Sequence, residues 1–188
     1  CTRRAPERLI PFAHINGRDS RQGMLAELQR MVEAGVRALK LYNAPQGHPG
    51  DTPNMLALYE FAQAHNMLLL NHYWSDDEIG RLTLQFPELI FIRGHGGASR
   101  LSRVYANVYD NIWSLSPLGV LERGIRQFDP HKILYGSDAF MNEPSVGLGM
   151  VVYANIPDED KRLILGLNMA RLLRRVGALP RPLHAWLG

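Results

Sequence analysis

Short apolar runs alternate with longer stretches of helical periodicity along the whole chain. Six runs have the apolar, partly β-branched composition that is typical of buried strands. They occupy residues 9–16, 36–42, 67–72, 89–95, 108–113 and 132–138. A helix is expected after each run, so the pattern indicates a series of βα units. Repeated units of this length predict a parallel sheet, because each return crossing must pass over a face of the sheet.

Local signals mark where several of these helices begin. Thr52 followed by Pro53 predicts a helix start, because threonine caps a helix and proline is tolerated at its first position. Ser75 and Glu78 have the spacing of a capping box. A last long helix is expected over 157–176, with acidic residues in its first turn and arginines in its last.

Two α/β architectures fit such a series. A doubly wound sheet would typically carry a glycine-rich phosphate-binding turn after an early strand, and the sequence shows none. A (β/α)8 barrel instead places its chemistry at the carboxyl ends of several strands. Three apolar runs end in His72, His95 and Asp138, which favours the barrel. We therefore predict an α/β fold of the TIM-barrel type, incomplete with about six βα units, in one domain over residues 1–188.

The composition narrows the range of partners. Hydrophobic residues make up 46% and charged residues 21%, as in ordinary globular proteins. No apolar run reaches the roughly 20 residues that cross a bilayer. The net charge of +3 comes from scattered basic residues rather than from the continuous stripe of a nucleic-acid binder. One cysteine fits a reducing compartment. We expect a cytoplasmic protein with a small-molecule substrate and without a membrane or nucleic-acid partner.

The three polar strand ends can share one site. Two imidazoles and a carboxylate suit zinc or another divalent metal, which would lower the pKa of a bound water toward about 7. Each residue also has a plain structural interpretation: a buried histidine can satisfy a backbone group, and an aspartate after Gly-Ser can belong to a turn. The coincidence of His72, His95 and Asp138 at three strand ends favours the shared site.

Three further residues are candidates for contact with a substrate. Lys40 lies at the end of the second apolar run and offers an amine that is either structural or substrate-facing. Tyr73 and Trp74 directly follow His72 and could line a pocket for an aromatic or unsaturated acid. Aromatic residues in such loops also pack into cores, and the sequence leaves both interpretations open.

Five stretches carry a pattern shared with a known family. They are residues 35–41 (GVRALKL), 69–72 (LLNH), 94–97 (GHGG), 133–138 (ILYGSD) and 166–173 (GLNMARLL). Their order and spacing resemble the amidohydrolase-related group of TIM-barrel hydrolases, which includes the enzymes similar to aminocarboxymuconate semialdehyde decarboxylase. The resemblance extends over nearly the whole chain.

This resemblance implies roles for individual residues. His72 would be the metal ligand of the family's fifth strand, and His95 the sixth-strand histidine, a catalytic acid/base or in some members a ligand. Asp138 would be the eighth-strand carboxylate that ligates the metal or takes the proton from its water. Asn168 would be a structural hydrogen-bonding residue. Lys40 would be an unmodified lysine, although some superfamily members carry a carboxylated, metal-bridging lysine there.

The chain departs from the family at the first metal ligands. Family members open with a His-x-His pair at the end of the first strand, and this sequence contains no such pair. His14 is superficially similar, but the residues before it resemble the family's third strand. We therefore expect the first two strands to be missing, and metal binding by this chain alone to be weak or absent. Exposed sheet edges would also favour a homodimer.

Three functions are compatible with these features. The leading hypothesis is a metal-dependent hydrolase that attacks a small carboxylic ester, lactone or amide through a metal-activated water. The first alternative keeps the site but makes it a metal-dependent decarboxylase of an unsaturated or aromatic acid. The second alternative is a catalytically silent remnant or scaffold, which the missing His-x-His pair would explain.

Overall fold

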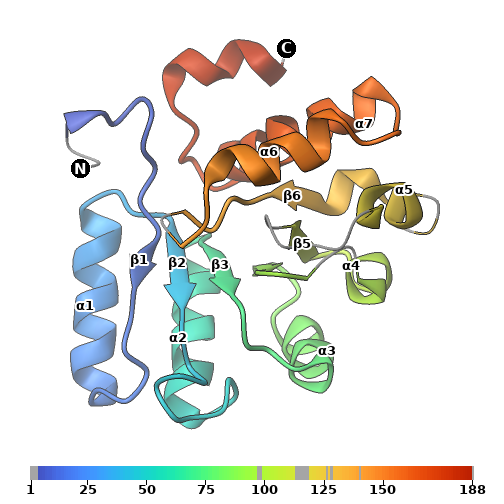
Figure 1. The fold of residues 1–188 in the computed structure, drawn as a ribbon. Helices are drawn as coiled ribbons and strands as arrows, with labels where there is room; N and C mark the ends of the chain where they lie inside the picture. Colours follow the sequence, from blue (N-terminus) through green and yellow to red (C-terminus); the bar gives the residue numbers. More distant parts are fainter. Residues whose placement is uncertain are drawn as a thin grey trace.

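A computed structural model describes residues 4–96, 99–112, 119–125, 127, 129–139 and 141–187 (Figure 1). Within these ranges six parallel strands form one sheet in sequential order. The strands are β1 (Ala13–His14), β2 (Ala38–Leu41), β3 (Leu68–Asn71), β4 (Ile90–Arg93), β5 (Val108–Ile112) and β6 (Ile133–Tyr135). Figure 1 shows the strands turning progressively from β1 to β6. Among the described residues β6 does not pair with β1, so the fold is an incomplete barrel, as predicted.

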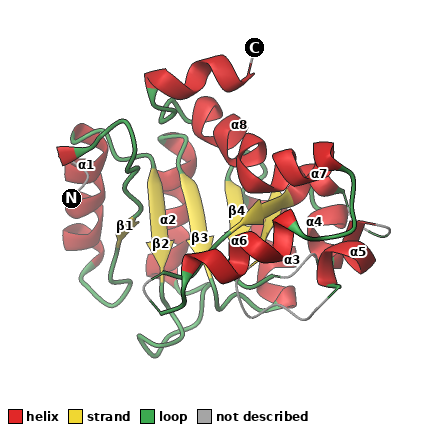
Figure 2. Ribbon diagram, turned by 45° about the horizontal axis from the view of Figure 1, so that its top comes forward, coloured by secondary structure: helices red, strands yellow, loops and turns green. Residues whose placement is uncertain are grey.

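Helices follow the strands along the chain (Figure 2). They are α1 (Arg21–Glu33), α2 (Pro53–Ala64), α3 (Asp76–Gln85), α4 (Arg100–Val104), α5 (Val120–Ile125), α6 (Pro144–Val152), α7 (Asp158–Arg162) and α8 (Asn168–Arg175). A π-helical turn at Leu163–Leu167 joins α7 to α8, so the long helix predicted over 157–176 is present with one interruption. Short 3-10 helices lie at Pro130–Lys132 and Arg181–Leu187. In the described part of the chain, none of the helices combines the length and the apolarity that a bilayer span requires.

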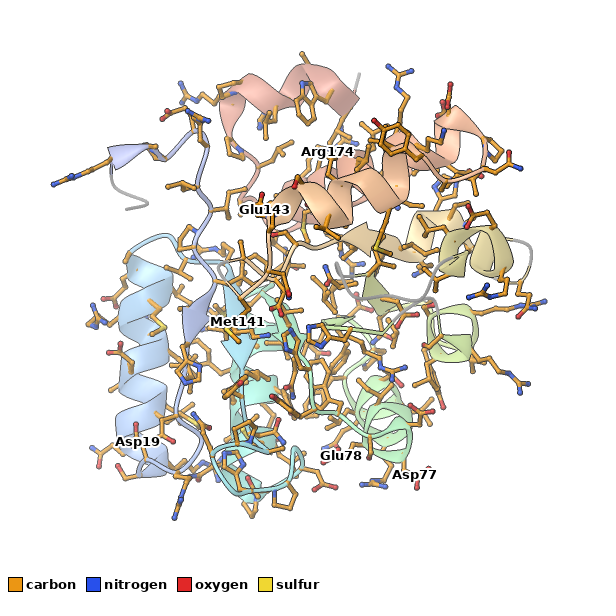
Figure 3. The ribbon with its side chains drawn as sticks, in the orientation of Figure 1. Asp19, Asp77, Glu78, Met141, Glu143 and Arg174 are labelled. Carbon is orange, nitrogen blue, oxygen red and sulfur yellow. The ribbon has the colours of Figure 1, made fainter. Side chains whose placement is uncertain are left out.

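The predicted helix starts are confirmed. The Thr52 hydroxyl accepts a hydrogen bond from the backbone N–H of Met55 at the start of α2. Ser75 and Glu78 form the reciprocal capping box at the start of α3, where Figure 3 labels Glu78. Each cap satisfies a backbone donor that a helix leaves free at its first turn, which stabilises the helix by about 1 kcal/mol.

The structure differs from the sequence-based prediction in the length of several strands and in one additional helix. The runs over 89–95 and 132–138 form strands only at Ile90–Arg93 and Ile133–Tyr135. The run over 9–16 forms a strand only at Ala13–His14. The sequence also did not predict α6, which follows the loop after β6. In addition, Trp113, the last residue of the predicted fifth run, lies outside the described residues.

Successive side chains along each strand point to opposite faces of the sheet, so they belong to two different buried layers. Leu39, Leu69 and Phe91 belong to a cluster that includes residues of α1, α2 and α3. Leu68 and Ile90 belong to a second cluster, which includes residues of α8. The strand register aligns members of each layer across the sheet, and full burial of such side chains contributes roughly 1.5–3 kcal/mol each. Strands β2, β3 and β4 are therefore fixed in register, and their last residues, Leu41, Asn71 and Arg93, lie level with one another.

Asn168 has the structural role that the family resemblance implies. It is buried at the start of α8. Its amide donates hydrogen bonds to the carbonyl oxygens of Pro130 and Ile133, each at 2.8 Å. These bonds hold α8 against β6 and the 3-10 helix that precedes it.

Candidate active site

The structure brings the three polar strand-end residues together. His72 directly follows β3, His95 lies two residues after β4, and Asp138 lies three residues after β6. The imidazole centroids of His72 and His95 are 4.1 Å apart, with their planes inclined by 32°. His95 Nε2 lies 3.8 Å from Asp138 Oδ2. Three separate βα units therefore deliver two imidazoles and one carboxylate to one place.

Lys40 extends from β2 into the same site. Its Nζ lies 2.6 Å from His72 Nε2. Because an ammonium group has only donors, it donates to the Nε2 lone pair, and a neutral His72 then carries its proton on Nδ1. Burial lowers the pKa of His72 to about 4, helped by the positive charge of Lys40. His72 is therefore neutral at physiological pH.

The Lys40 amine keeps its charge at neutral pH. Burial lowers its pKa to about 8, while the negative charge of Asp138 raises it. A pKa of about 8 leaves most of the amine protonated at pH 7. The site thus contains a partly buried cation.

His95 and Asp138 share an uncommon backbone conformation. Their φ angles are +60° and +55°, and Asn66 is the one other non-glycine residue with positive φ in the described ranges. Such strain costs of order 1–3 kcal/mol per residue and is typical of functional sites. Burial lowers the pKa of His95, whereas the charge of Asp138 acts to raise it. The pair is therefore held, at a cost in stability, with the His95 imidazole within ion-pair distance of the Asp138 carboxylate.

Gly94 leaves room for the His72 ring. A Cβ atom at position 94 would overlap Cδ2 and Nε2 of the His72 imidazole. The backbone N–H of Gly94 also donates to the carbonyl oxygen of Asn71 at 2.8 Å. Close approach between the ends of β3 and β4, rather than backbone conformation, explains glycine at this position.

Tyr73 and Trp74 lie in different environments. The Tyr73 side chain is partly exposed. Its ring centroid is 6.1 Å from that of His72, and its hydroxyl donates to the Tyr42 hydroxyl at 3.2 Å. Trp74 is only 5% exposed and belongs to the core cluster. Its indole N–H donates to the Tyr59 hydroxyl at 3.1 Å. The predicted substrate contact for Trp74 is therefore corrected to core packing, whereas Tyr73 remains a candidate together with Tyr42, which the sequence did not suggest.

A buried amide pair beneath the site was also missed. Asn71 Nδ2 donates to Asn43 Oδ1 at 2.6 Å, and Asn71 Oδ1 accepts from the backbone N–H of Tyr73 at 3.1 Å. Both amides are buried, so these bonds are expected to hold the loops after β2 and β3 together. The sequence signal that could have revealed this pair is Asn71, a polar residue near the end of an otherwise apolar run.

The described residues do not assemble a complete metal centre. Within the described ranges no three His, Cys, Asp or Glu side chains are placed to hold one ion. The Lys40 ammonium faces His72 Nε2, and Asp138 Oδ2 accepts from Asn142 Nδ2 at 3.3 Å. His14 contacts the Lys40 carbonyl oxygen and the amide of Gln46. The metal-ligand roles of His72 and Asp138 stay predictions, and the chemistry available to these side chains themselves is anion binding and proton transfer.

Parallel βα units with polar residues at the carboxyl ends of the strands define a barrel of the TIM type. The family model described as amidohydrolase matches residues 2–175. The chain therefore belongs to the amidohydrolase family, which confirms the resemblance noted in the sequence and supports an enzymatic role. A search of curated proteins found no match.

Solved structures share this fold at low sequence identity. An uncharacterised TIM-barrel protein from Bordetella bronchiseptica has a TM-score of 0.82 at 19% identity, over 94% of this chain and 70% of that one. The 5-carboxyvanillate decarboxylase of Sphingomonas paucimobilis has a TM-score of 0.76 at 16% identity, over 92% and 69%. A dihydroxybenzoic acid decarboxylase from Polaromonas, solved with bound manganese, has a TM-score of 0.76 at 17% identity, over 95% and 73%. At these identities the likeness concerns the fold.

Proposed function

We propose that the protein is a decarboxylase of a small aromatic or unsaturated carboxylic acid. The observation that carries this proposal is the Lys40 ammonium in the same site as the His95–Asp138 pair. A cation can hold the substrate carboxylate while a neighbouring imidazole delivers a proton. Two of the solved structures named above are decarboxylases by name, which supports the proposal.

Lys40 is suited to binding a carboxylate. An ammonium group has three N–H donors, and only one is needed for His72 Nε2. Charge-assisted hydrogen bonds are about twice as strong as neutral ones. Partial burial of Lys40 strengthens the attraction further, because the surroundings are less polar than water. The half-exposed rings of Tyr42 and Tyr73, packed edge to face, would flank a planar substrate.

His95 supplies the proton that decarboxylation consumes. The bond between the carboxylate carbon and the substrate breaks, its electron pair stays on the substrate carbon, and carbon dioxide leaves. The protonated His95 imidazole then transfers a proton to that carbon and regains one from water. Burial lowers the pKa of His95 and so disfavours its imidazolium, whereas the Asp138 carboxylate, 3.8 Å away, acts in the opposite direction and favours the form that carries the proton. General acid catalysis of this kind contributes about 10²- to 10⁴-fold in rate.

Hydrolysis of a small carboxylic ester, lactone or amide is the second candidate. The same His95–Asp138 pair favours it, because an imidazole beside a carboxylate can also accept a proton from an attacking water. A panel of aromatic and unsaturated acids, esters and lactones separates the candidates. Carbon dioxide release without incorporation of oxygen from labelled water into the organic product supports the decarboxylase, and incorporation into that product supports the hydrolase. Absence of turnover across the panel would support a silent scaffold.

Removing the Lys40 charge tests the proposed carboxylate contact. We expect Lys40→Met to weaken substrate binding by about 10- to 100-fold, as for the loss of a charge-assisted hydrogen bond. The effect should appear mainly in KM, measured by carbon dioxide release. Lys161→Met, which removes a lysine that pairs with Asp158 on α7, is the matched control. An unchanged KM for Lys40→Met would show that the substrate carboxylate does not bind to Lys40.

Metal content tests the predicted cofactor. A divalent metal, with zinc as the first choice, is the cofactor expected from the sequence, and the described residues offer it an incomplete ligand set. We therefore expect substoichiometric zinc and manganese in protein equilibrated with either ion and then passed through gel filtration. Elemental analysis measures both ions, with His72→Asn as the comparison. A stoichiometric, tightly held ion that is lost in His72→Asn would contradict this expectation.

A further inference from the structure

Asp110 is a fully buried carboxylate that the proton-transfer chemistry does not use. It lies in the middle of β5 and is 0% exposed. The strand register pairs it with Arg93, the last residue of β4. Aspartate is almost never fully buried unless its charge has partners. The partners of Asp110 therefore indicate what this side chain does.

The main partner of Asp110 is Ser99. The Ser99 backbone N–H donates to Asp110 Oδ2 at 2.7 Å, and the Ser99 hydroxyl donates to the same carboxylate at 3.0 and 3.1 Å. Arg93 Nη1 lies 4.0 Å from Asp110 Oδ1 and donates to Ser99 Oγ at 2.8 Å. Arg93 Nη2 also donates to Asp76 at the start of α3. These contacts join β4, β5, α3 and the start of α4 in one hydrogen-bonded network.

This network contacts the backbone directly after His95. Ser99 is the N-cap of α4, where its Oγ accepts from the backbone N–H of Leu101. A Cβ atom at Gly96 would overlap Asp110 Oδ1, so the backbone immediately after His95 packs directly on the carboxylate. The hydrogen bond from the Gly94 N–H to Asn71 fixes the other side of His95.

We propose that Asp110 is the positioning residue for His95. By binding Ser99 and supporting the backbone at Gly96, the Asp110 carboxylate keeps His95 at its left-handed φ and at its distance from Asp138. Charge-assisted hydrogen bonds contribute enough to offset a strained backbone of this size. The proposal rests on the proposed function in one respect: the proton transfer that depends on the position of His95 is a step of the proposed decarboxylation.

Substitution of Asp110 should affect the rate more than substrate binding. We expect Asp110→Ala to lower kcat by about 100-fold, since a misplacement of roughly 1 Å can have that effect. KM should change little, because Lys40 lies on a different strand. Asp110→Asn keeps an oxygen acceptor of the same shape and should restore part of the rate. This variant also tests the proposal if Asp110→Ala does not fold.

Asn107→Ala is the matched control. The Asn107 amide is buried at the amino end of β5 and donates to the carbonyl oxygens of Phe86 and Leu89 rather than to Ser99. Its loss should lower stability without lowering kcat. If Asn107→Ala lowered kcat as much as Asp110→Ala, the role of Asp110 would be general stability and the proposal would be overturned.

A spectroscopic measurement separates this proposal from the proposed function. The imidazole ¹⁵N signals of His95 and the amide proton of Ser99 should shift in Asp110→Ala and, less, in Asp110→Asn, but not in Asn107→Ala. Such shifts support positioning even if no decarboxylation is found. Unchanged His95 signals in the Asp110 variants would overturn it, even if the protein proves to be a decarboxylase.

Discussion

Replacing His95 with asparagine is expected to lower kcat by about 10²- to 10⁴-fold, the usual contribution of a general acid. Asparagine tolerates positive φ well, so the backbone at φ +60° can be kept while the proton carrier is removed. The midpoint of thermal unfolding should therefore stay close to that of the parent. Steady-state release of carbon dioxide measures the rate.

His131→Gln is the control for His95→Asn. His131 is exposed in the 3-10 helix that precedes β6, at the end of the strand away from Asp138. Its replacement should leave both kcat and KM unchanged. A His95→Asn variant that keeps its activity would show that the proton comes from another group.

Truncating Trp74 to alanine is expected to lower the free energy of unfolding by about 3–5 kcal/mol. The indole packs against the Phe91 ring, with centroids 5.3 Å apart, and donates a hydrogen bond to Tyr59. Alanine would leave a cavity and remove the Tyr59 contact. Denaturant unfolding measures the loss, and Trp74→Phe should recover part of it.

Tyr73→Ala is the comparison for Trp74→Ala. Because Tyr73 is half exposed, its truncation should change stability much less and should instead raise KM for an aromatic acid. If Trp74→Ala raised KM and left the free energy of unfolding unchanged, the sequence-based substrate role of Trp74 would be correct after all.

Much of the fold follows from signals that are local in the chain. The Ser75–Glu78 capping box and the Thr52 cap act within one helical turn, so the sequence alone locates these helix starts. The gathering of His72 and Asp138 is also predictable, since parallel strands carry their carboxyl ends to the same edge. That inference needs only the order of the strands.

The remaining features depend on contacts between distant segments. The sequence of α6 contains two glycines and no charged residue, so it lacks the polar face and the helix propensity that would indicate a helix. The burial of Trp74 depends on Tyr59, which belongs to the preceding helix. The bond between Lys40 and His72 joins residues 32 positions apart, and no spacing rule relates them.

Gly94 restricts how this protein can vary. Even the single methyl group of alanine at position 94 would clash with the His72 imidazole and push it out of its place. Gly35 and Gly177 have left-handed φ angles, but an added Cβ would meet nothing within 4 Å. Asparagine can occupy such positions at a modest cost. Substitutions at Gly35 and Gly177 are therefore expected to be tolerated during evolution, whereas every substitution at Gly94 would displace the His72 ring.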